Sequence, residues 1–149
     1  MAGRFTLSMI KPRAVAEGYT AEILNIITKQ GGFRIAALKM IRLSREQAMK
    51  FYEVHKQRPF YNELVDFMSS GPIVVFVLEK ENAVEAFRNF IGATDPSKAQ
   101  QGTIRAKFGK SIQENCVHGS DSDENAKREI KFFFASHHIF DANGNILEL

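Results

Sequence analysis

The run Ile73-Val74-Val75-Phe76-Val77-Leu78 constrains the fold of this chain more than any other segment. It follows the breaker pair Gly71-Pro72, and most of its residues are β-branched. Such an unbroken apolar run is typical of a central strand that is buried on both faces. A fold built around this strand needs covering layers on both sides of a sheet.

Other segments supply the remaining elements. Alternating or apolar patterns predict further strands over residues 5–10, 33–43 and 115–118. Helical patterns follow residue 20, Ser44, Phe60, Asn82 and Ser122, and the pairs Ser44 with Gln47 and Asn82 with Glu85 are cap signatures. The residues Ala48, Phe51, Tyr52 and His55 would share one helical face. Residues 92–115 lack periodicity, so we expect a long functional loop there.

The order β-α-β-α-β-α-β predicts the fold class. It favours an α+β, ferredoxin-like domain with a mainly antiparallel four-stranded sheet covered by helices over a doubly wound domain. No repeat, linker or low-complexity tract divides the chain, so residues 1–149 are expected to form a single domain.

Composition narrows the class of protein. The 149 residues are 44% hydrophobic and 25% charged, as in globular proteins. The longest apolar run is too short to cross a bilayer, and the first residues lack the apolar core of a signal peptide, so we expect a cytoplasmic protein without membrane contact. One cysteine excludes an intramolecular disulfide and suits a reducing compartment. A net charge of +3 fits anionic small molecules as well as nucleic acid.

The segment Asn115-Cys116-Val117-His118-Gly119-Ser120-Asp121-Ser122 carries the strongest chemical signal. An imidazole is largely neutral at pH 7, so one ring nitrogen of His118 keeps a lone pair for attack. The helix that begins near Ser122 offers free backbone N–H groups that stabilise a phosphate. The segment alone also fits an ordinary turn histidine followed by a helix cap.

Charged and neutral donors elsewhere fit phosphoryl transfer, in which the protein mainly positions groups and neutralises charge. Lys11, Arg88 and Arg105 stay charged at neutral pH, and Thr94 and Asn115 add neutral donors. Taken singly, each cation also fits a solvated surface charge.

Taken together, these residues resemble the nucleoside diphosphate kinase family. The resemblance extends over residues 4–135 and rests on motifs in the family's order: Ile10-Lys11-Pro12, Tyr52, Arg58-Pro59-Phe60, Ser70-Gly71-Pro72, Arg88, Thr94-Asp95-Pro96, Gly102-Thr103-Ile104-Arg105 and the segment 115–122. It implies a ping-pong transfer of the γ-phosphoryl group of a nucleoside triphosphate to a diphosphate through a phosphohistidine on His118. It also implies nucleotide binding by Lys11, Phe60, Arg88, Thr94, Arg105 and Asn115.

The resemblance gives roles to further residues. Glu129 would orient His118, Ser120 would bond to that carboxylate, and the Tyr52 hydroxyl would lie near His118. Phe60 would stack on the nucleobase and accept many bases. From sequence position alone, Glu129 also fits a boundary salt bridge, and Tyr52 and Phe60 fit the core.

The family also implies a cofactor and an assembly. The chain has no pattern typical of a dedicated cation site, so Mg²⁺ is expected to arrive with the nucleotide, with Asp121 at most an indirect partner. The family assembles as tetramers or hexamers, and the sequence leaves both open. Binding to nucleic acid is not required.

Three features stand apart from the family pattern. Arg13 occupies a position where an acidic or small polar residue is common, and the tail Ala135–Leu149 has no clear match. Cys116 is expected on the same strand face as His118 in a packing role, because no triad pattern accompanies it. His137 and His138 lack the cluster of a structural zinc site.

Two other functions stay open. A non-enzymatic nucleotide or RNA binder would bind without turnover, and a phosphohistidine carrier would pass the phosphoryl group to a protein. Nucleotide exchange separates them: a binder shows affinity alone, a carrier labels His118 without forming a triphosphate, and a kinase does both.

Overall fold

The sheet is the centre of the computed structural model, which describes residues 3–149. It has the order β2-β3-β1-β4, formed by Phe5–Ile10 (β1), Arg34–Ile41 (β2), Ile73–Glu79 (β3) and Val117–Gly119 (β4). Every neighbouring pair is antiparallel. The predicted four-stranded sheet is therefore confirmed, and it is antiparallel throughout.

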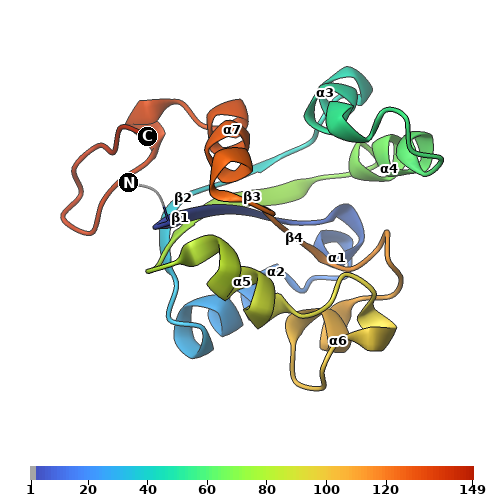
Figure 1. The fold of residues 1–149 in the computed structure, drawn as a ribbon, viewed down its shortest axis with the longest axis horizontal. Helices are drawn as coiled ribbons and strands as arrows, with labels where there is room; N and C mark the ends of the chain where they lie inside the picture. The colour runs from blue at the N-terminus through green and yellow to red at the C-terminus, as the bar shows by residue number, and fades with distance from the viewer. Residues whose placement is uncertain (1–2) are drawn as a thin grey trace.

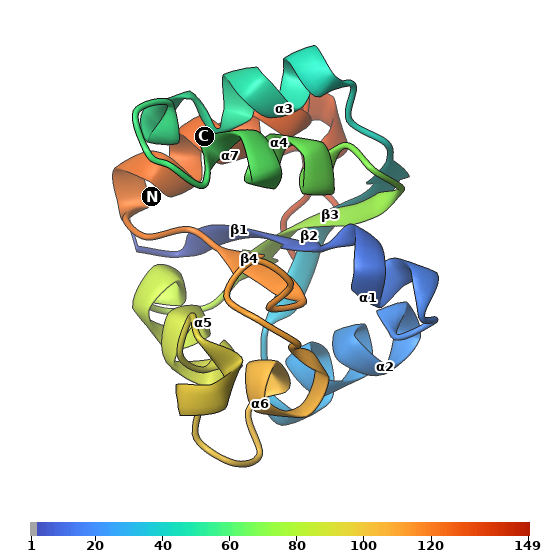
Figure 2. The same cartoon turned by 90° about the vertical axis from the view of Figure 1, so that its right-hand side faces the viewer.

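Helices α2 (Thr20–Asn25) and α5 (Ala83–Ile91) make the two crossovers of the fold. The first joins β1 to β2, the second joins β3 to β4, and both lie on the same face of the sheet (Figure 2). This repeated β-α-β arrangement is the ferredoxin-like α+β fold that the element order predicts. The short helices α1 (Pro12–Ala16) and α6 (Ile104–Phe108) lie on the same side of the sheet.

Three helices cover the opposite face (Figures 1 and 2): α3 (Arg45–Phe51), α4 (Tyr61–Met68) and α7 (Asp123–Phe133). Short helical turns occupy the connections, namely a π turn at Ile26–Gln30 and 3₁₀ turns at Glu53–His55, Pro96–Lys98 and Ser136–His138. No helix among residues 3–149 has the length and apolar character needed to span a membrane.

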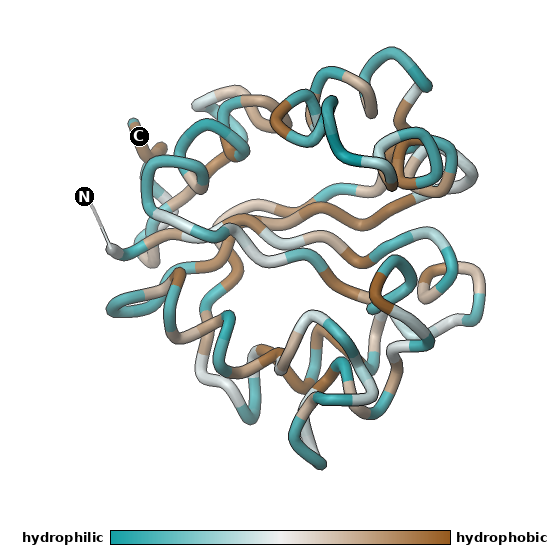
Figure 3. Tube along the Cα trace, turned by 45° about the vertical axis from the view of Figure 1, so that its right-hand side comes forward, coloured by the Kyte–Doolittle hydropathy of each residue, from teal (hydrophilic) through white to brown (hydrophobic). Residues whose placement is uncertain are grey.

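Strand β3 has the two buried faces that its sequence predicts. Ile73, Val75 and Val77 pack into the core beneath α3, α4 and α7. Val74, Phe76 and Leu78 pack on the other side with α2 and α5. The apolar residues accordingly concentrate along the strands and on the helix faces toward them (Figure 3).

One predicted helix start is confirmed and another has a different geometry. Ser44 forms the expected capping box, because its hydroxyl accepts from the Gln47 N–H and its own N–H donates to the Gln47 side chain. Asn82 instead has a left-handed backbone with φ of 52°, and its amide donates to the Glu85 carboxylate. Asn82 is therefore the N-cap residue of α5 as predicted, but its side chain bonds Glu85 rather than a backbone N–H.

Helix α3 is shorter than predicted. It ends at Phe51, so Tyr52 is its C-cap and His55 lies in a separate 3₁₀ turn. His55 therefore does not continue the helical face of Ala48, whereas the Tyr52 N–H still donates to the Ala48 carbonyl and Tyr52 packs in the same core as Ala48 and Phe51.

The expected long loop over residues 92–115 contains two short helices. Asp95 accepts a hydrogen bond from the Ser97 N–H, and Thr103 accepts one from the Ala106 N–H to start α6. Each helix has five residues or fewer. Elements of this length show no apolar period, which is why the pattern indicated a loop.

Strand β4 begins later than predicted because Cys116 forms a tight turn. Its φ is +68°, and the Val117 N–H donates to the Asn115 carbonyl at 2.9 Å, as in a γ-turn. Cys116 then packs with the α2 and α5 side of the core, whereas the His118 ring contacts Phe51 on the other side. The expectation that the thiol shares a face with His118 was wrong.

The C-terminal tail lies beside β2. The Phe140 N–H donates to the Ala36 carbonyl at 2.9 Å, and Phe140 forms a bridge with Ile146. Ala36 belongs to the irregular step in the pairing of β2 with β3. The tail thus covers part of an edge of the sheet.

Candidate active site

His118 and Glu129 form the centre of the site. His118 lies opposite Met9 in the pairing of β4 with β1, and its Nε2 is 2.8 Å from Glu129 Oε1. The Ser120 hydroxyl donates to the same carboxylate oxygen at 2.7 Å. Ser120 is fixed in turn by the Leu7 N–H, which donates to its oxygen at 3.2 Å. Strand β1 thereby holds both partners of Glu129.

The charge on Glu129 determines which nitrogen of His118 carries the proton. Burial raises the pKa of this carboxyl, but His118 and the hydrogen bonds from His118 and Ser120 outweigh it and leave the pKa below its usual value. An ionised carboxylate only accepts hydrogen bonds, so Nε2 of His118 donates. In the neutral ring Nδ1 then keeps the free lone pair.

Gly119 allows α5 to lie close to this strand. A Cβ atom at Gly119 would lie 3.2 Å from Ile91 Cδ1, tighter than most real contacts. A larger residue after His118 would therefore require the end of the Ile91 side chain to shift by a few tenths of an ångström.

Aromatic residues form one wall of the site. The Phe51 ring meets the His118 ring edge to face at 5.8 Å, and Tyr52 packs against Phe51. The Tyr52 hydroxyl is 4.0 Å from Met9 Sδ, and Met9 is the residue opposite His118. Burial, assisted by the charge of Glu129, raises the pKa of Tyr52, so the hydroxyl stays protonated.

Phe60 is not a core residue, because 42% of its surface is exposed. Its ring lies 5.6 Å from that of His55, which stacks in turn on Tyr52 at 6.4 Å. His55 was not among the residues predicted for the site. Burial and then Arg58 lower its pKa, while Asp121 raises it, so His55 lies within electrostatic reach of the site.

Lys11 and Asn115 join two distant segments at the site. The Lys11 ammonium donates to Asn115 Oδ1 at 2.8 Å, and the Asn115 amide donates to the Thr94 carbonyl at 3.0 Å. Lys11 is only 7% exposed. Burial, followed by the charge of Arg105, lowers its pKa to about 7. The expectation that Lys11 stays charged at neutral pH was therefore wrong for the chain without a ligand, because burial disfavours the charged form.

Arg105 is a second buried cation. Its guanidinium donates to the carbonyls of Gly92 and Val117 at 3.1 and 2.9 Å. Burial is the main reason that its pKa falls to about 10, and Arg88 lowers it further. The exposed Arg88, with Thr94 and Arg105, lines a groove of about 410 Å³ that has no carboxylate among its lining residues. Such a groove suits an anion.

Asp121 follows Ser120 in the chain, and its carboxylate accepts a hydrogen bond from the Asn125 side-chain amide at 2.6 Å. That bond is the main cause that lowers its pKa. Within residues 3–149, no three His, Cys, Asp or Glu side chains gather as a metal site would require.

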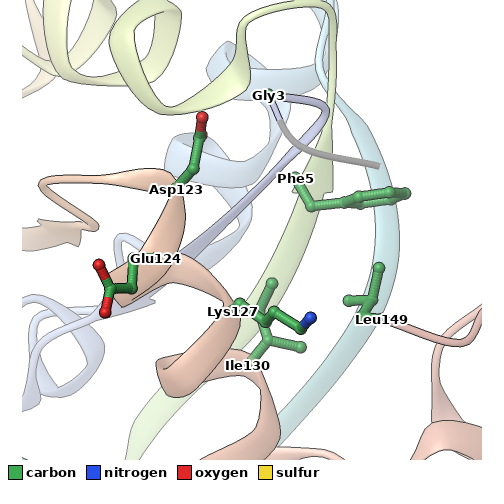
Figure 4. Close-up of a pocket in the computed structure, with 7 residues that line it drawn as sticks. All are labelled: Gly3, Phe5, Asp123, Glu124, Lys127, Ile130 and Leu149. Carbon is green, nitrogen blue, oxygen red and sulfur yellow. The ribbon is translucent and has the colours of Figure 1, made fainter.

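A second cavity of about 250 Å³ lies along α7 (Figure 4). It is lined by Gly3, Phe5, Asp123, Glu124, Lys127, Ile130 and Leu149. None of the predicted site residues is among them. The chemistry around His118, rather than cavity shape, therefore identifies the candidate site.

The buried Lys11 generates a prediction about stability. Its folded pKa of about 7 lies below the ordinary 10.5, so the unfolded chain binds more protons between these values. The free-energy cost that the buried charge of Lys11 imposes on the folded state is largest below pH 7. It disappears as the pH rises toward 10.5. Lys11→Met should therefore raise the Tm relative to the parent chain more at pH 6.5 than at pH 9.5, as measured by thermal unfolding. An equal difference at both pH values would contradict this.

Comparison with known proteins agrees with the geometry. The profile of the family described as "Nucleoside diphosphate kinase" matches residues 4–139. The nucleoside diphosphate kinase of Nitratiruptor sp. is 59% identical over 134 residues, which cover 90% of this chain and 97% of that protein. That of Flavobacterium psychrophilum is 56% identical over 140 residues, which cover 94% of this chain and 100% of the relative.

Solved structures give the same result. The Aquifex aeolicus nucleoside diphosphate kinase superposes with a TM-score of 0.87 at 46% identity, over 91% of this chain and 97% of the other. A halophilic nucleoside diphosphate kinase from Halobacterium salinarum in complex with CDP has a TM-score of 0.87 at 34% identity, over 92% and 91%. On sequence and fold together, this chain belongs to the nucleoside diphosphate kinase family of phosphotransferases.

Proposed function

We propose that the chain works by a ping-pong mechanism through a phosphohistidine on His118. The observation that carries this proposal is the hydrogen bond from His118 to Glu129, which leaves Nδ1 with its lone pair. Nδ1 attacks the γ-phosphorus of a nucleoside triphosphate, a P–N bond forms, and the P–O bond to the departing diphosphate breaks. A second diphosphate then attacks the phosphohistidine through its terminal oxygen and restores the free ring.

Glu129 and Ser120 act on the histidine in this proposal. The Glu129 carboxylate stabilises the positive charge that develops on the ring as the P–N bond forms. The Ser120 hydroxyl fixes that carboxylate, and the neutral Tyr52 hydroxyl offers a donor near the transferring group.

The cations act on the phosphates. Lys11, Arg88 and Arg105 neutralise the charge of the triphosphate, which is the main contribution that a protein makes to this reaction. Thr94 and Asn115 supply neutral donors. A bound phosphate also supplies the counterion that the buried Lys11 lacks, so binding favours its charged form.

Phe60 stacks on the nucleobase in this proposal. Its partly exposed ring supports the role, and stacking alone does not distinguish one base from another. Broad base specificity follows from this chemistry.

Mg²⁺ is proposed to enter with the nucleotide. The ion would neutralise phosphate oxygens, which it holds together with water and few protein carboxylates. Asp121 fits an indirect contact, because one of its oxygens is already bonded to Asn125.

We also propose one domain over residues 1–149, a homo-oligomer and a cytoplasmic location. The edge strand β2 exposes 50% of Leu38 and 60% of Met40, which supports contact with another copy. The single buried thiol of Cys116 suits a reducing compartment.

The phosphoenzyme is the first test. Protein mixed with γ-labelled ATP and Mg²⁺, without an acceptor, should retain one acid-labile, base-stable phosphoryl group per chain. Added GDP or CDP should then remove the label as the corresponding triphosphate. His118→Ala should abolish both steps.

The outcomes separate the alternatives. Label that no diphosphate removes would indicate a phosphohistidine carrier, and ATP binding without label would indicate a binding module. Acid-stable label on Ser120 or Ser122, or exchange by His118→Ala, would refute the role of His118.

Glu129→Gln tests the orienting role. The amide keeps the size of the side chain but loses the charge that stabilises the ring during attack, so we expect phosphoenzyme formation to slow by about 10- to 100-fold. ADP affinity should change little. Rapid-quench labelling measures the first quantity and calorimetry the second; an unchanged labelling rate would make Glu129 a structural residue.

Phe60→Ala tests the base contact. Loss of a stacking contact of about 1–3 kcal/mol should raise the KM for nucleotides by roughly 5- to 160-fold. The increase should be similar for purine and pyrimidine nucleotides in steady-state assays. A loss confined to one base would mean that Phe60 reads base edges.

A further inference from the structure

A second contact joins the two segments that carry Lys11 and Asn115. Arg13 Nη1 lies 3.3 and 3.4 Å from the two carboxylate oxygens of Glu114. Arg13 Nε also donates to Glu17 Oε1 at 3.0 Å. The guanidinium thus bridges two carboxylates, one in its own segment and one in the segment before His118.

The Arg13–Glu114 ion pair joins the same two segments as the Lys11–Asn115 hydrogen bond. Arg13 is two residues after Lys11, and Glu114 is the residue before Asn115. The bonds Lys11 Nζ to Asn115 Oδ1 and Lys11 N–H to the Cys116 carbonyl, both 2.8 Å, join the same two segments. Arg13 and Glu114 therefore form a second set of links between the same pair of segments.

Nucleotide binding would affect these two sets of links differently. Lys11 is proposed to contact the phosphates, so its bond to Asn115 is the link whose geometry changes if the ammonium moves toward a bound nucleotide. Arg13 is not among the residues proposed to contact the nucleotide, so its pairing with Glu114 need not change on binding.

Few other hydrogen bonds tie residues 110–114 to the rest of the described chain. The Glu114 N–H donates to Ser111, and the Glu114 carbonyl accepts from the Lys110 N–H, so these bonds stay within the segment. The contact from Gln113 to the Glu63 carbonyl is long, at 3.5 Å. Arg13 is thus a main anchor of this segment.

We propose that Arg13, paired with Glu114, is a positioning residue that keeps Asn115 in place while Lys11 engages the nucleotide. The proposal rests on the proposed function, because it assumes that Lys11 and Asn115 bind nucleotide. The pair pre-organises the binding site, so it affects affinity for nucleotide more than the rate of transfer from bound nucleotide.

Screening by salt distinguishes this role from simple packing. The side chains of Arg13 and Glu114 are 47% and 29% exposed, so dissolved ions reach the pair. The Debye length falls from about 10 Å at 0.1 M to about 3 Å at 1 M salt. The contribution of the pair should therefore fade over this range.

The first experiment compares Arg13→Gln with Arg45→Gln. Arg45 pairs with Asp66 at 3.0 Å at an exposed site, neither residue is among the proposed nucleotide contacts, and the pair serves as the matched control. At low salt, Arg13→Gln should raise the Kd for ADP by about two- to fivefold, and the difference from the parent chain should vanish near 1 M salt. Arg45→Gln should leave the Kd for ADP unchanged at both salt concentrations. The kcat at saturating nucleotide should equal that of the parent chain in both variants.

A charge reversal provides the second experiment. Arg13→Glu and Glu114→Arg should each weaken ADP binding at low salt, and the double variant should recover most of the loss. Thermal unfolding of all variants reports whether folding itself has changed.

The results decide the proposal as follows. An ADP Kd of Arg13→Gln that equals that of the parent chain at low salt, or a double variant without recovery, would overturn it. ADP binding needs no turnover, so a failure to label His118 would refute the proposed mechanism and leave this comparison intact. Absence of ADP binding by the parent chain would overturn both proposals.

Discussion

The pairing of β4 with β1 is the interaction on which the geometry of the candidate active site depends. Only three residues of β4 pair, and the register sets His118 opposite Met9. The strand is entered through the left-handed turn at Cys116, a conformation that costs of order 1–3 kcal/mol for residues other than glycine. Burial of Cys116 and the bond from the Lys11 N–H to its carbonyl offset that cost. The turn lets Asn115 bond Lys11 while His118 meets Glu129.

Much of the fold could be predicted because its signals are local. The apolar run of β3 and the capping box at Ser44 each lie within a few neighbouring residues, and both are present in the structure. The turn at Cys116 has no such signal, because cysteine has no preference for positive φ. Helix α6 is too short for its apolar residues to repeat. These two features depend on tertiary packing, which local patterns do not describe.

The residues of the candidate active site also differ in how well the sequence indicates them. The segment around His118 marks the histidine directly, and the family pattern indicates Glu129, whose carboxylate lies 2.8 Å from the ring. The contact of Arg13 with Glu114 joins residues 101 positions apart, and nothing in either neighbourhood indicates it. His55 was overlooked for a related reason: its proximity to Phe60 depends on where α3 ends. Contacts between residues far apart in the chain are thus harder to find from the sequence than a residue within a recognisable motif.

The burial of Lys11 and Arg105 has a consequence for the life of the protein in a cell. Each side chain is 7% exposed, and carbonyl or amide oxygens, rather than carboxylates, accept their hydrogen bonds. An anion that binds between these two cations removes their mutual repulsion, and any ligand that binds only the folded chain shifts the folding equilibrium toward it. If nucleotide phosphates bind at these two cations as proposed, the nucleotide would be part of what keeps the chain folded, and resistance to proteolysis should follow the supply of substrate.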